Sequence, residues 1–153
     1  MRDRLLLDSM LGKLATYLRM CGYHTAYVLD GVDPADDPGD DAIRRRATGS
    51  DRTIFTRDRE LAARADDVLL LRSREVADQL AELDAAGYDL TLDAEPDRCG
   101  SCNGDVHRVD AGASLPAYAP DPAGTDCWRC RECRQVFWKG SHWDDVRSTL
   151  DAV

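Results

Sequence analysis

The chain has 153 residues, of which 43% are hydrophobic, and this length suits one globular domain with or without a small additional module. Its 24 Asp and 5 Glu outweigh 18 Arg and 2 Lys and give a net charge of -9, which argues against a broad basic surface for nucleic acid. No apolar run is as long as a membrane span, and acidic residues come too early for a signal peptide. We therefore expect a cytoplasmic protein that does not enter a membrane.

Segments typical of strands and helices alternate along the first 88 residues. The expected strands are 4–8, 25–29, 52–56 and 67–71, and the expected helices are 9–22, 41–48, 58–65 and 74–86. The apolar residues of the first helix follow the spacing of one buried face. They are Leu11, Leu14, Ala15 and Leu18. The alternation predicts an α/β fold with a mostly parallel sheet covered on both faces, in which the carboxyl ends of the strands share one edge.

The sequence changes character after residue 88. Residues 89–98 lack periodicity and contain proline, so we expect a linker between a domain over 1–88 and a small module over 99–153. Within the module we expect a flexible insert at 110–126, a strand at 136–138 and a short helix at 143–150.

Two Cys-x-x-Cys pairs lie in the module, Cys99 with Cys102 and Cys130 with Cys133. Each pair places two thiolates on a tight turn, and two such turns facing each other form a tetrahedral site of four sulfurs for Zn2+. A reducing compartment favours metal over disulfides, and a module this small needs a structural metal. We therefore expect these four cysteines to bind a structural zinc ion.

Cys127 creates a second possible pairing, because Cys127 and Cys130 have the same spacing. We favour Cys130 with Cys133, since the residues from Val136 onward then leave the turn as a strand. Cys127 is then a spare thiol. Cys21, on the apolar side of the first helix, is expected to be a buried core thiol.

Aspartates follow the predicted strands at Asp8, Asp30 and Asp58, and Asp40 and Asp41 open the helix between the second and third strands. In a parallel sheet the acids that follow the first and third strands reach the same edge, and the acids that open the intervening helix can lean over it. Gathered carboxylates repel one another unless a cation such as Mg2+ or Mn2+ binds among them. Such an ion can activate water for attack on a phosphodiester.

Helix capping is the structural alternative for these aspartates, and it is the commoner role for any one of them taken alone. Asp30, which precedes Gly31, is expected to be a turn residue. The many other aspartates are best explained by solubility. Neither a phosphate-binding loop nor a dinucleotide fingerprint occurs in the sequence, which argues against those nucleotide-binding classes.

The module is locally basic and aromatic. Its members are Arg129, Arg131, Arg134, Lys139 and Arg147, with Trp128, Phe137, Trp138, His142 and Trp143 among them. Two interpretations stay open. These residues bind RNA by phosphate pairing and base stacking, or the aromatic ones form the small core of the module itself.

Taken in order, the segments resemble a known family. LLLDSMLGKLATYLRMCGY, IFTRDREL, a Cys-x-x-Cys pair and WRCRECRQVFWKGSHW are similar to the RNase family named for the C-terminal domain of the mutator exonuclease. The resemblance covers nearly the whole chain. It implies a PIN-like nuclease domain of three layers joined to a C-terminal zinc ribbon, with Mg2+ or Mn2+ bound for RNA cleavage by Asp8, Asp58 and Asp40 or Asp41.

The resemblance favours a metal-dependent ribonuclease whose ribbon contacts RNA or a protein partner. Arg57, Arg59 and Arg72 are candidates for steadying the scissile phosphate. The alternative is a catalytically weak or inactive PIN-like module that binds RNA or protein. Neither the particular RNA nor the oligomeric state follows from the sequence.

Overall fold

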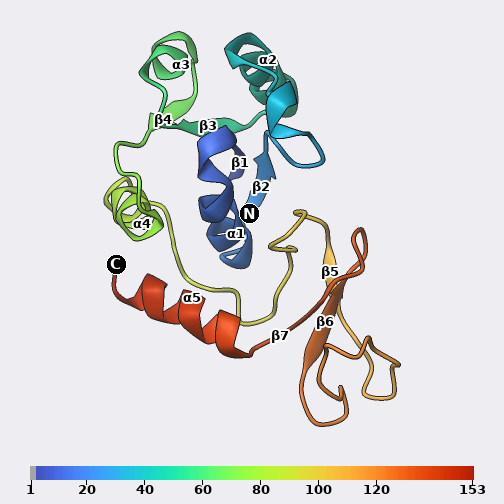
Figure 1. The fold of residues 1–153 in the computed structure, drawn as a ribbon. Helices are drawn as coiled ribbons and strands as arrows, with labels where there is room; N and C mark the ends of the chain where they lie inside the picture. The colour runs from blue at the N-terminus through green and yellow to red at the C-terminus, as the bar shows by residue number, and fades with distance from the viewer. Residues whose placement is uncertain (1–2) are drawn as a thin grey trace.

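The computed structural model describes residues 3–153 and contains a larger α/β part and a smaller cysteine-containing part (Figure 1). Four parallel strands form the first sheet, in the order β2–β1–β3–β4. They are β1 (Arg4–Leu7), β2 (His24–Tyr27), β3 (Thr53–Thr56) and β4 (Val68–Leu70). The prediction of an α/β fold with a parallel sheet is confirmed.

Helices follow each of these strands and cover both faces of the sheet. They are α1 (Gly12–Met20), α2 (Asp40–Ser50), α3 (Arg59–Arg64) and α4 (Val76–Ala85), with the short 3-10 turns η1 (Ser9–Leu11) and η2 (Pro34–Asp36). Figure 1 shows α2 and α3 above the sheet and α1 and α4 below it. No helix within residues 3–153 is both long and apolar enough to cross a bilayer.

The three leucines of β1 explain how one short strand serves both faces. Leu5 and Leu7 pack with α1 and α4, whereas Leu6 packs with Ile43 of α2 and Leu61 of α3. Successive side chains of a strand point to opposite faces of the sheet, so an uninterrupted apolar run is the pattern of a strand buried on both sides.

α1 lies within the helix predicted at residues 9–22 and buries the face predicted for it. Cys21 is buried at its end, as expected. Gly22 ends the helix with a φ of +89°, in the left-handed region that glycine adopts readily. A Cβ atom at this position would lie 2.6 Å from the carboxylate of Asp93. The buried residues of the predicted face are Leu11, Leu14, Ala15 and Leu18.

Residues 99–140, here called the cysteine module, form a second sheet. Its antiparallel strands are β5 (Val106–Arg108), β6 (Cys127–Cys130) and β7 (Val136–Trp138), in that order. The strand predicted at 136–138 is confirmed. β5 was not predicted, because three residues are too few to show an alternating pattern.

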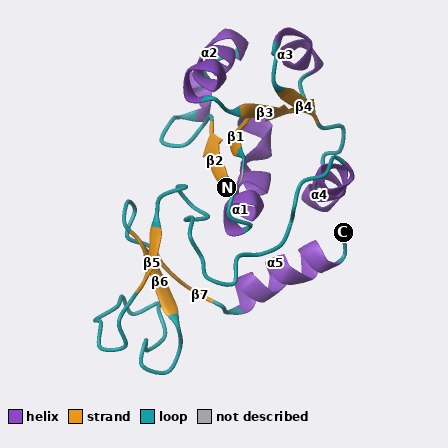
Figure 2. Cartoon of the chain, turned by 180° about the vertical axis from the view of Figure 1, so that it is seen from behind, coloured by secondary structure: helices purple, strands orange, loops and turns teal. Residues whose placement is uncertain are grey.

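α5 (Ser141–Asp151) leads from the cysteine module back to the α/β part, as the view from behind shows (Figure 2). Its buried Val146 joins the core that α1 and α4 share, and Leu150 packs against that core. The last helix is longer than the predicted 143–150 and belongs by packing to the α/β part. The domain boundary at residue 99 stays a prediction.

The cysteine module contacts the edge of the sheet where the strands begin. Asn103 accepts a hydrogen bond at 2.9 Å from the backbone N–H of Thr25, on the edge strand β2. Arg19 of α1, which is 3% exposed, donates to the carbonyl of Gly100 at 3.2 Å and forms an ion pair with Asp30 at 2.6 Å. These contacts attach the module near the beginning of β2.

Candidate active site and metal centre

The neighbouring strands β1 and β3 bring two of the predicted acids to the same edge. Asp8 follows β1 and is 4% exposed, and Asp58 follows β3. Thr56 connects them, because its hydroxyl donates to Oδ2 of Asp8 at 2.6 Å and accepts the N–H of Asp58 at 2.9 Å. The helices after these two strands lie on opposite faces of the sheet, which is the kind of crevice where open α/β sheets place their sites.

Both acids also cap the element that follows them. Oδ1 of Asp8 accepts the N–H of Ser9 at 2.7 Å, and Oδ1 of Asp58 accepts the N–H groups of Glu60 at 2.9 Å and Leu61 at 3.4 Å. The capping interpretation is thus confirmed for Asp8 and Asp58. It leaves room for a second role, since each carboxylate oxygen has two lone pairs and can accept or coordinate more than one partner.

Asp40 and Asp41 both begin α2, but only Asp40 is coupled to this edge. Burial, followed by the negative charges of Asp58 and Asp8, raises the pKa of Asp40 above its usual value. The side chain of Asp41 is 72% exposed and pairs with Arg44 at 3.5 Å. Asp8 and Asp58, with Asp40 coupled to them electrostatically, are called the acid edge below.

The acid edge is more open than a preformed metal site. Within the described part of the chain, the four cysteines are the only group of three or more possible ligands with donor atoms all within 4.8 Å of one another. Mg2+ and Mn2+ keep several waters when they bind proteins, so they need fewer direct ligands than a structural zinc. The oxygen donors fit such an ion, and it would relieve the repulsion felt by Asp40. The catalytic assignment of Asp8, Asp40, Asp41 and Asp58 stays a prediction.

Thr56 is a residue of this edge that the sequence did not point to. A threonine two residues before an aspartate, at the end of a strand, is a local hydrogen-bonding pattern that could have identified it. Arg57, between Thr56 and Asp58, was among the candidates for phosphate binding. Its Nε atom is buried and has no hydrogen-bond partner in the part of the protein described here.

The loop after β4 supplies no acid to this edge. Glu82 of α4 accepts the N–H groups of Arg72 and Ser73, each at 3.0 Å. Burial opposes ionisation of Glu82, but these backbone donors outweigh it and hold its pKa below the usual value. Glu82 therefore fixes the loop.

Asp30 lies in a turn with Gly31 at a φ of +71°, as predicted, and its carboxylate pairs with Arg19.

The four predicted cysteines converge where two turns meet. The Sγ atoms of Cys99 and Cys133 are 3.7 Å apart, and those of Cys102 and Cys130 are 3.5 Å apart. Sulfurs bound tetrahedrally at about 2.3 Å from one zinc ion lie roughly 3.8 Å from each other. The donor set and its spacing therefore fit Zn2+, and the predicted clustering of these four cysteines is confirmed.

The two turns have matching backbone conformations. The residue after each pair, Asn103 or Arg134, has a left-handed φ, of +71° and +69° respectively. Burial raises the pKa values of Cys99 and Cys102, because a buried thiolate is unfavourable without a nearby cation. A bound zinc ion would supply that charge.

Cys127 lies outside this cluster. It is 1% exposed, and its thiol donates to the carbonyl of Thr125 at 3.3 Å. The preference for Cys130 with Cys133 over Cys127 with Cys130 is therefore confirmed, and Cys127 is a spare buried thiol.

A comparison with protein-family models matches the Mut7-C RNAse domain over residues 3–150. The chain belongs to this family. The match includes the acid edge and all four clustered cysteines, so the resemblance seen in the sequence is confirmed. Membership in the Mut7-C RNAse domain family indicates a nuclease-type function. No curated protein and no solved structure matches the chain.

Proposed function

We propose that this member of the Mut7-C RNAse domain family is a divalent-metal-dependent ribonuclease that hydrolyses RNA phosphodiester bonds at the acid edge. The observation that supports the proposal most directly is the pair Asp8 and Asp58, joined through Thr56 at the carboxyl ends of adjacent strands. Asp40 completes the set through its electrostatic coupling to both. Bound there, Mg2+ or Mn2+ would activate water and stabilise the charge that develops on the phosphate.

The residues of the chain have separate tasks in this proposal. Thr56 holds Oδ2 of Asp8 and the backbone of Asp58 in fixed orientations before any substrate arrives. Arg57, between Thr56 and Asp58 in the chain, would pair with a phosphate oxygen and so position the scissile bond. In the same proposal the α/β part is PIN-like, and the cysteine module is a zinc ribbon whose structural zinc supports binding of RNA or a partner.

The test is cleavage of a labelled single-stranded RNA by the full chain, with zinc content verified and other divalent metals removed by desalting. A chelator is avoided because it would also remove zinc. We expect cleavage only after Mg2+ or Mn2+ is added, and a loss of about a hundredfold or more in Asp8→Asn, Asp40→Asn and Asp58→Asn.

Asp41→Asn is the matched control, since it makes the same change at the neighbouring, exposed position and should cleave at the wild-type rate. Cleavage that needs no added metal, or that persists in Asp8→Asn, would contradict the proposal.

A non-catalytic module that binds RNA or protein is the second candidate, and the capping hydrogen bonds of Asp8 and Asp58 favour it. Under that alternative these acids only stabilise the fold. Thermal unfolding during a Mn2+ titration distinguishes the two. A melting temperature that rises with Mn2+, and does not rise in the Asp8→Asn, Asp58→Asn double variant, supports a metal site. No rise in the wild type supports the second candidate.

A further inference from the structure

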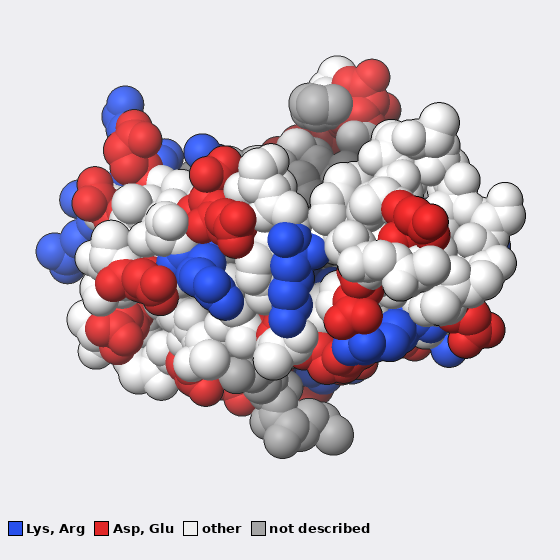
Figure 3. Space-filling model, turned by 90° about the horizontal axis from the view of Figure 1, so that it is seen from below, with Lys and Arg blue, Asp and Glu red and all other residues white. Residues whose placement is uncertain are grey.

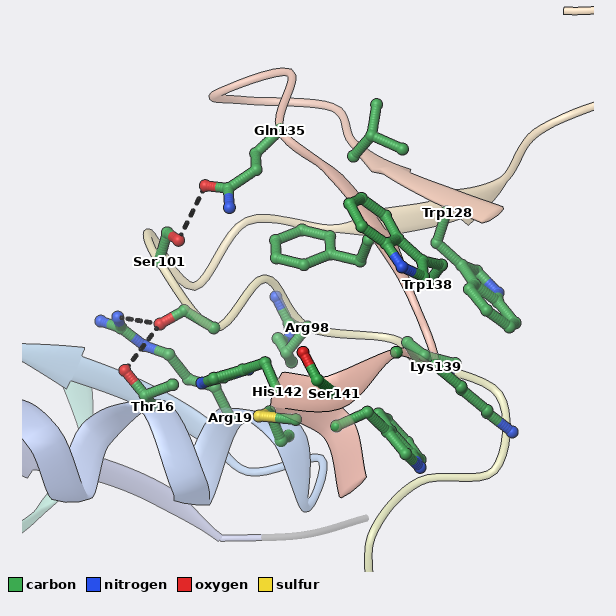
Figure 4. A pocket seen from close by; sticks show the side chains of 17 residues that line it. Thr16, Arg19, Arg98, Ser101, Trp128, Gln135, Trp138, Lys139, Ser141 and His142 are labelled. Carbon is green, nitrogen blue, oxygen red and sulfur yellow. Dashed lines mark hydrogen bonds between the residues drawn. The ribbon is translucent and has the colours of Figure 1, made fainter. Parts of the chain in front are cut away.

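A cavity of about 480 Å³ lies between α1, the cysteine module and the beginning of α5. In Figure 4, Trp128 and Trp138 of the module lie on one side of it, and Thr16 and Arg19 of α1 lie on the other. The volume is within the range of ligand-binding sites, roughly 300 to 1,000 Å³. The segment that distinguishes the family resemblance, residues 138–143, forms part of the wall.

The lining of this cavity differs in charge from the surface of the whole protein. None of the described residues that line it is an aspartate or a glutamate, although the chain carries a net charge of -9. On the face that Figure 3 shows, Lys and Arg lie among Asp and Glu rather than in one basic strip. A cavity without acids is therefore a place where an anionic ligand avoids the repulsion of the surrounding surface.

Lys139 is the cation of the cavity that forms no ion pair among residues 3–153, although its charge is felt by Glu95. Arg19 and Arg98 are each paired with an aspartate, at 2.6 and 3.0 Å. Lys139 has no ion pair with any residue from 3 to 153, and its Nζ donates to the carbonyl of Ala94 at 2.7 Å. The ammonium also lies over the rings of Trp128 and Trp143, 5.8 and 5.1 Å from their centroids. Only one of its three N–H bonds is used by the Ala94 carbonyl, so a phosphate oxygen could accept from another.

The first turn of α5 adds further donors. Residues 141–143 line the cavity, and Gly140 begins the helix without a side-chain cap. The first backbone N–H groups of a helix have no partner inside the helix and carry a partial positive charge. Together with Lys139 they form a site suited to one phosphate group.

Trp138 is held in a defined orientation in the wall of the cavity. Its ring stacks on Tyr118, with centroids 6.3 Å apart and planes 29° apart. A Cβ atom at Gly140 would lie 2.6 Å from Nε1 of Trp138, so glycine allows the close approach of backbone and indole. A fixed indole that is partly exposed is a good surface for stacking a nucleic-acid base.

α1 connects this cavity to the acid edge. Its beginning follows Asp8 at the carboxyl edge of the sheet, and Thr16 and Met20 line the cavity near its end. Lys13, Thr16 and Met20 recur at helical spacing on one side of α1, and Lys13 is exposed. Residues 12 to 20 span about 12 Å, which roughly four stacked nucleotides cover.

We infer that the cavity binds one nucleotide of a single-stranded RNA, with its base on Trp138 and its phosphate at Lys139 and the first turn of α5. The strand then follows α1 past Lys13 toward the acid edge. The direction of the strand rests on the proposed ribonuclease function, whereas binding in the cavity does not require hydrolysis.

The test is the binding of a fluorescein-labelled ten-nucleotide uridine RNA to the zinc-loaded full chain, measured by anisotropy without Mg2+ or Mn2+. We expect Trp138→Ala to bind about tenfold more weakly and Trp138→Phe to retain most of the affinity. Lys139→Gln should bind more weakly and lower the slope of log Kd against log salt concentration by about 0.7. Arg45→Gln is the matched control, because Arg45 is an exposed cation of α2 and does not line the cavity.

Zinc content and melting temperature are measured for every variant, and Lys139→Gln decides if Trp138→Ala does not fold. Wild-type protein that does not bind the RNA, or equal weakening in Arg45→Gln and Lys139→Gln, overturns the inference. Unchanged binding in Lys139→Gln, with metal-dependent cleavage intact, also overturns it and leaves the ribonuclease proposal standing. Weakened binding in Lys139→Gln without any cleavage by the wild type supports the cavity and contradicts the ribonuclease.

If the wild type cleaves RNA, the dependence of KM on RNA length provides a second test. Lys139→Gln should raise KM for the ten-nucleotide RNA and leave KM unchanged for a two-nucleotide RNA, which is too short to reach from the acid edge to the cavity. An equal change in KM for both lengths would contradict the path along α1.

Discussion

The acid edge lies where the strands of the parallel sheet end, and the cysteine module contacts the sheet where the strands begin. Different interactions organise the two regions. At the acid edge, the pairing of β1 with β3 and the hydroxyl of Thr56 orient the carboxylates without any metal. In the cysteine module, a small apolar cluster that includes Val106 and Trp128 surrounds four sulfurs. The sheet thus positions Asp8 and Asp58 as part of its own fold, whereas a metal is expected to complete the fold of the cysteine module.

The two regions nevertheless depend on each other through a few buried polar contacts. Arg52 is buried at the edge where the strands begin and donates to the carbonyls of Leu5 and His24, each at 2.9 Å. Asn103 of the cysteine module contacts His24 and Thr25. Unfolding of the module should therefore destabilise the sheet at its edge strand β2.

The largest effect, on zinc content, is expected when a cysteine of the cluster is replaced, compared with the same replacement at Cys127. Cys99→Ser and Cys127→Ser make the same change at two buried thiols, but only Cys99 lies in the cluster of four. Structural zinc sites contribute about 10 to 16 kcal/mol in small zinc-binding peptides, so losing one ligand should unfold the cysteine module. We expect zinc per chain, measured by mass spectrometry, to fall from one to near zero in Cys99→Ser only. Zinc loss in Cys127→Ser with retention in Cys99→Ser would contradict the assigned pairing.

Arg19 tests the contact between the two regions. Its guanidinium donates to the carbonyls of Thr25 and Gly100 and pairs with Asp30, all from a side chain that is 3% exposed. Arg19→Met should cost about 3 kcal/mol of unfolding free energy, because buried carbonyls lose a charged donor. Urea unfolding measures this loss. Arg45→Met, on the exposed side of α2, should change stability by less than about 0.5 kcal/mol. Equal losses in the two variants would show that Arg19 does not join the regions.

The sequence predicted the elements of the α/β part because its apolar patterns are local. The burial of Leu11, Leu14 and Leu18 follows from helical spacing, and the acids at the ends of β1 and β3 follow from parallel topology. Spacing also predicted the four cysteines, because two-residue separations specify the turns themselves.

The unpredicted features depend on contacts between residues that are distant in sequence. The choice between Asp40 and Asp41 depends on the rotation of α2, which neither residue type reveals. The packing of Val146 against α4 and the contacts of Asn103 with β2 join segments dozens of residues apart. No periodic pattern encodes such contacts, so they become visible only when the chain is folded.

The pH dependence of stability tests the edge where the module docks. Nδ1 of His24 accepts a hydrogen bond from Arg52 at 2.8 Å and must be unprotonated to do so. Burial, together with the charges of Arg52 and Arg98, lowers the pKa of His24 to about 4. The unfolded chain takes up this proton near pH 6.5, so the unfolded state binds more protons between about pH 4 and 6.5. The stability that neutral His24 contributes should be fully present above about pH 6.5 and should decline as the pH falls toward 4.

Partial exposure of His24 to solvent reduces this contribution. We expect the difference in unfolding free energy between wild type and His24→Gln to change by about 2 kcal/mol across that pH range. Urea unfolding at several pH values measures the difference, with zinc content followed at each pH because thiolates also take up protons. A pH slope in His24→Gln equal to that of the wild type would assign the dependence to other groups.

The smallest expected change in stability concerns Thr56, and it asks whether the acid edge is held by the hydroxyl or by the sheet alone. Thr56→Val keeps the shape of a fully buried side chain but removes the donor to Asp8 and the acceptor for the N–H of Asp58. Leaving these buried groups without a partner should cost about 1.5 kcal/mol, and Thr56→Ser should recover most of it because it restores the hydroxyl. Urea unfolding and Mn2+-dependent RNA cleavage are measured on the same preparations. If the hydroxyl orients the carboxylates, cleavage falls in Thr56→Val and returns in Thr56→Ser, whereas full cleavage in Thr56→Val would mean that strand pairing alone positions Asp8 and Asp58.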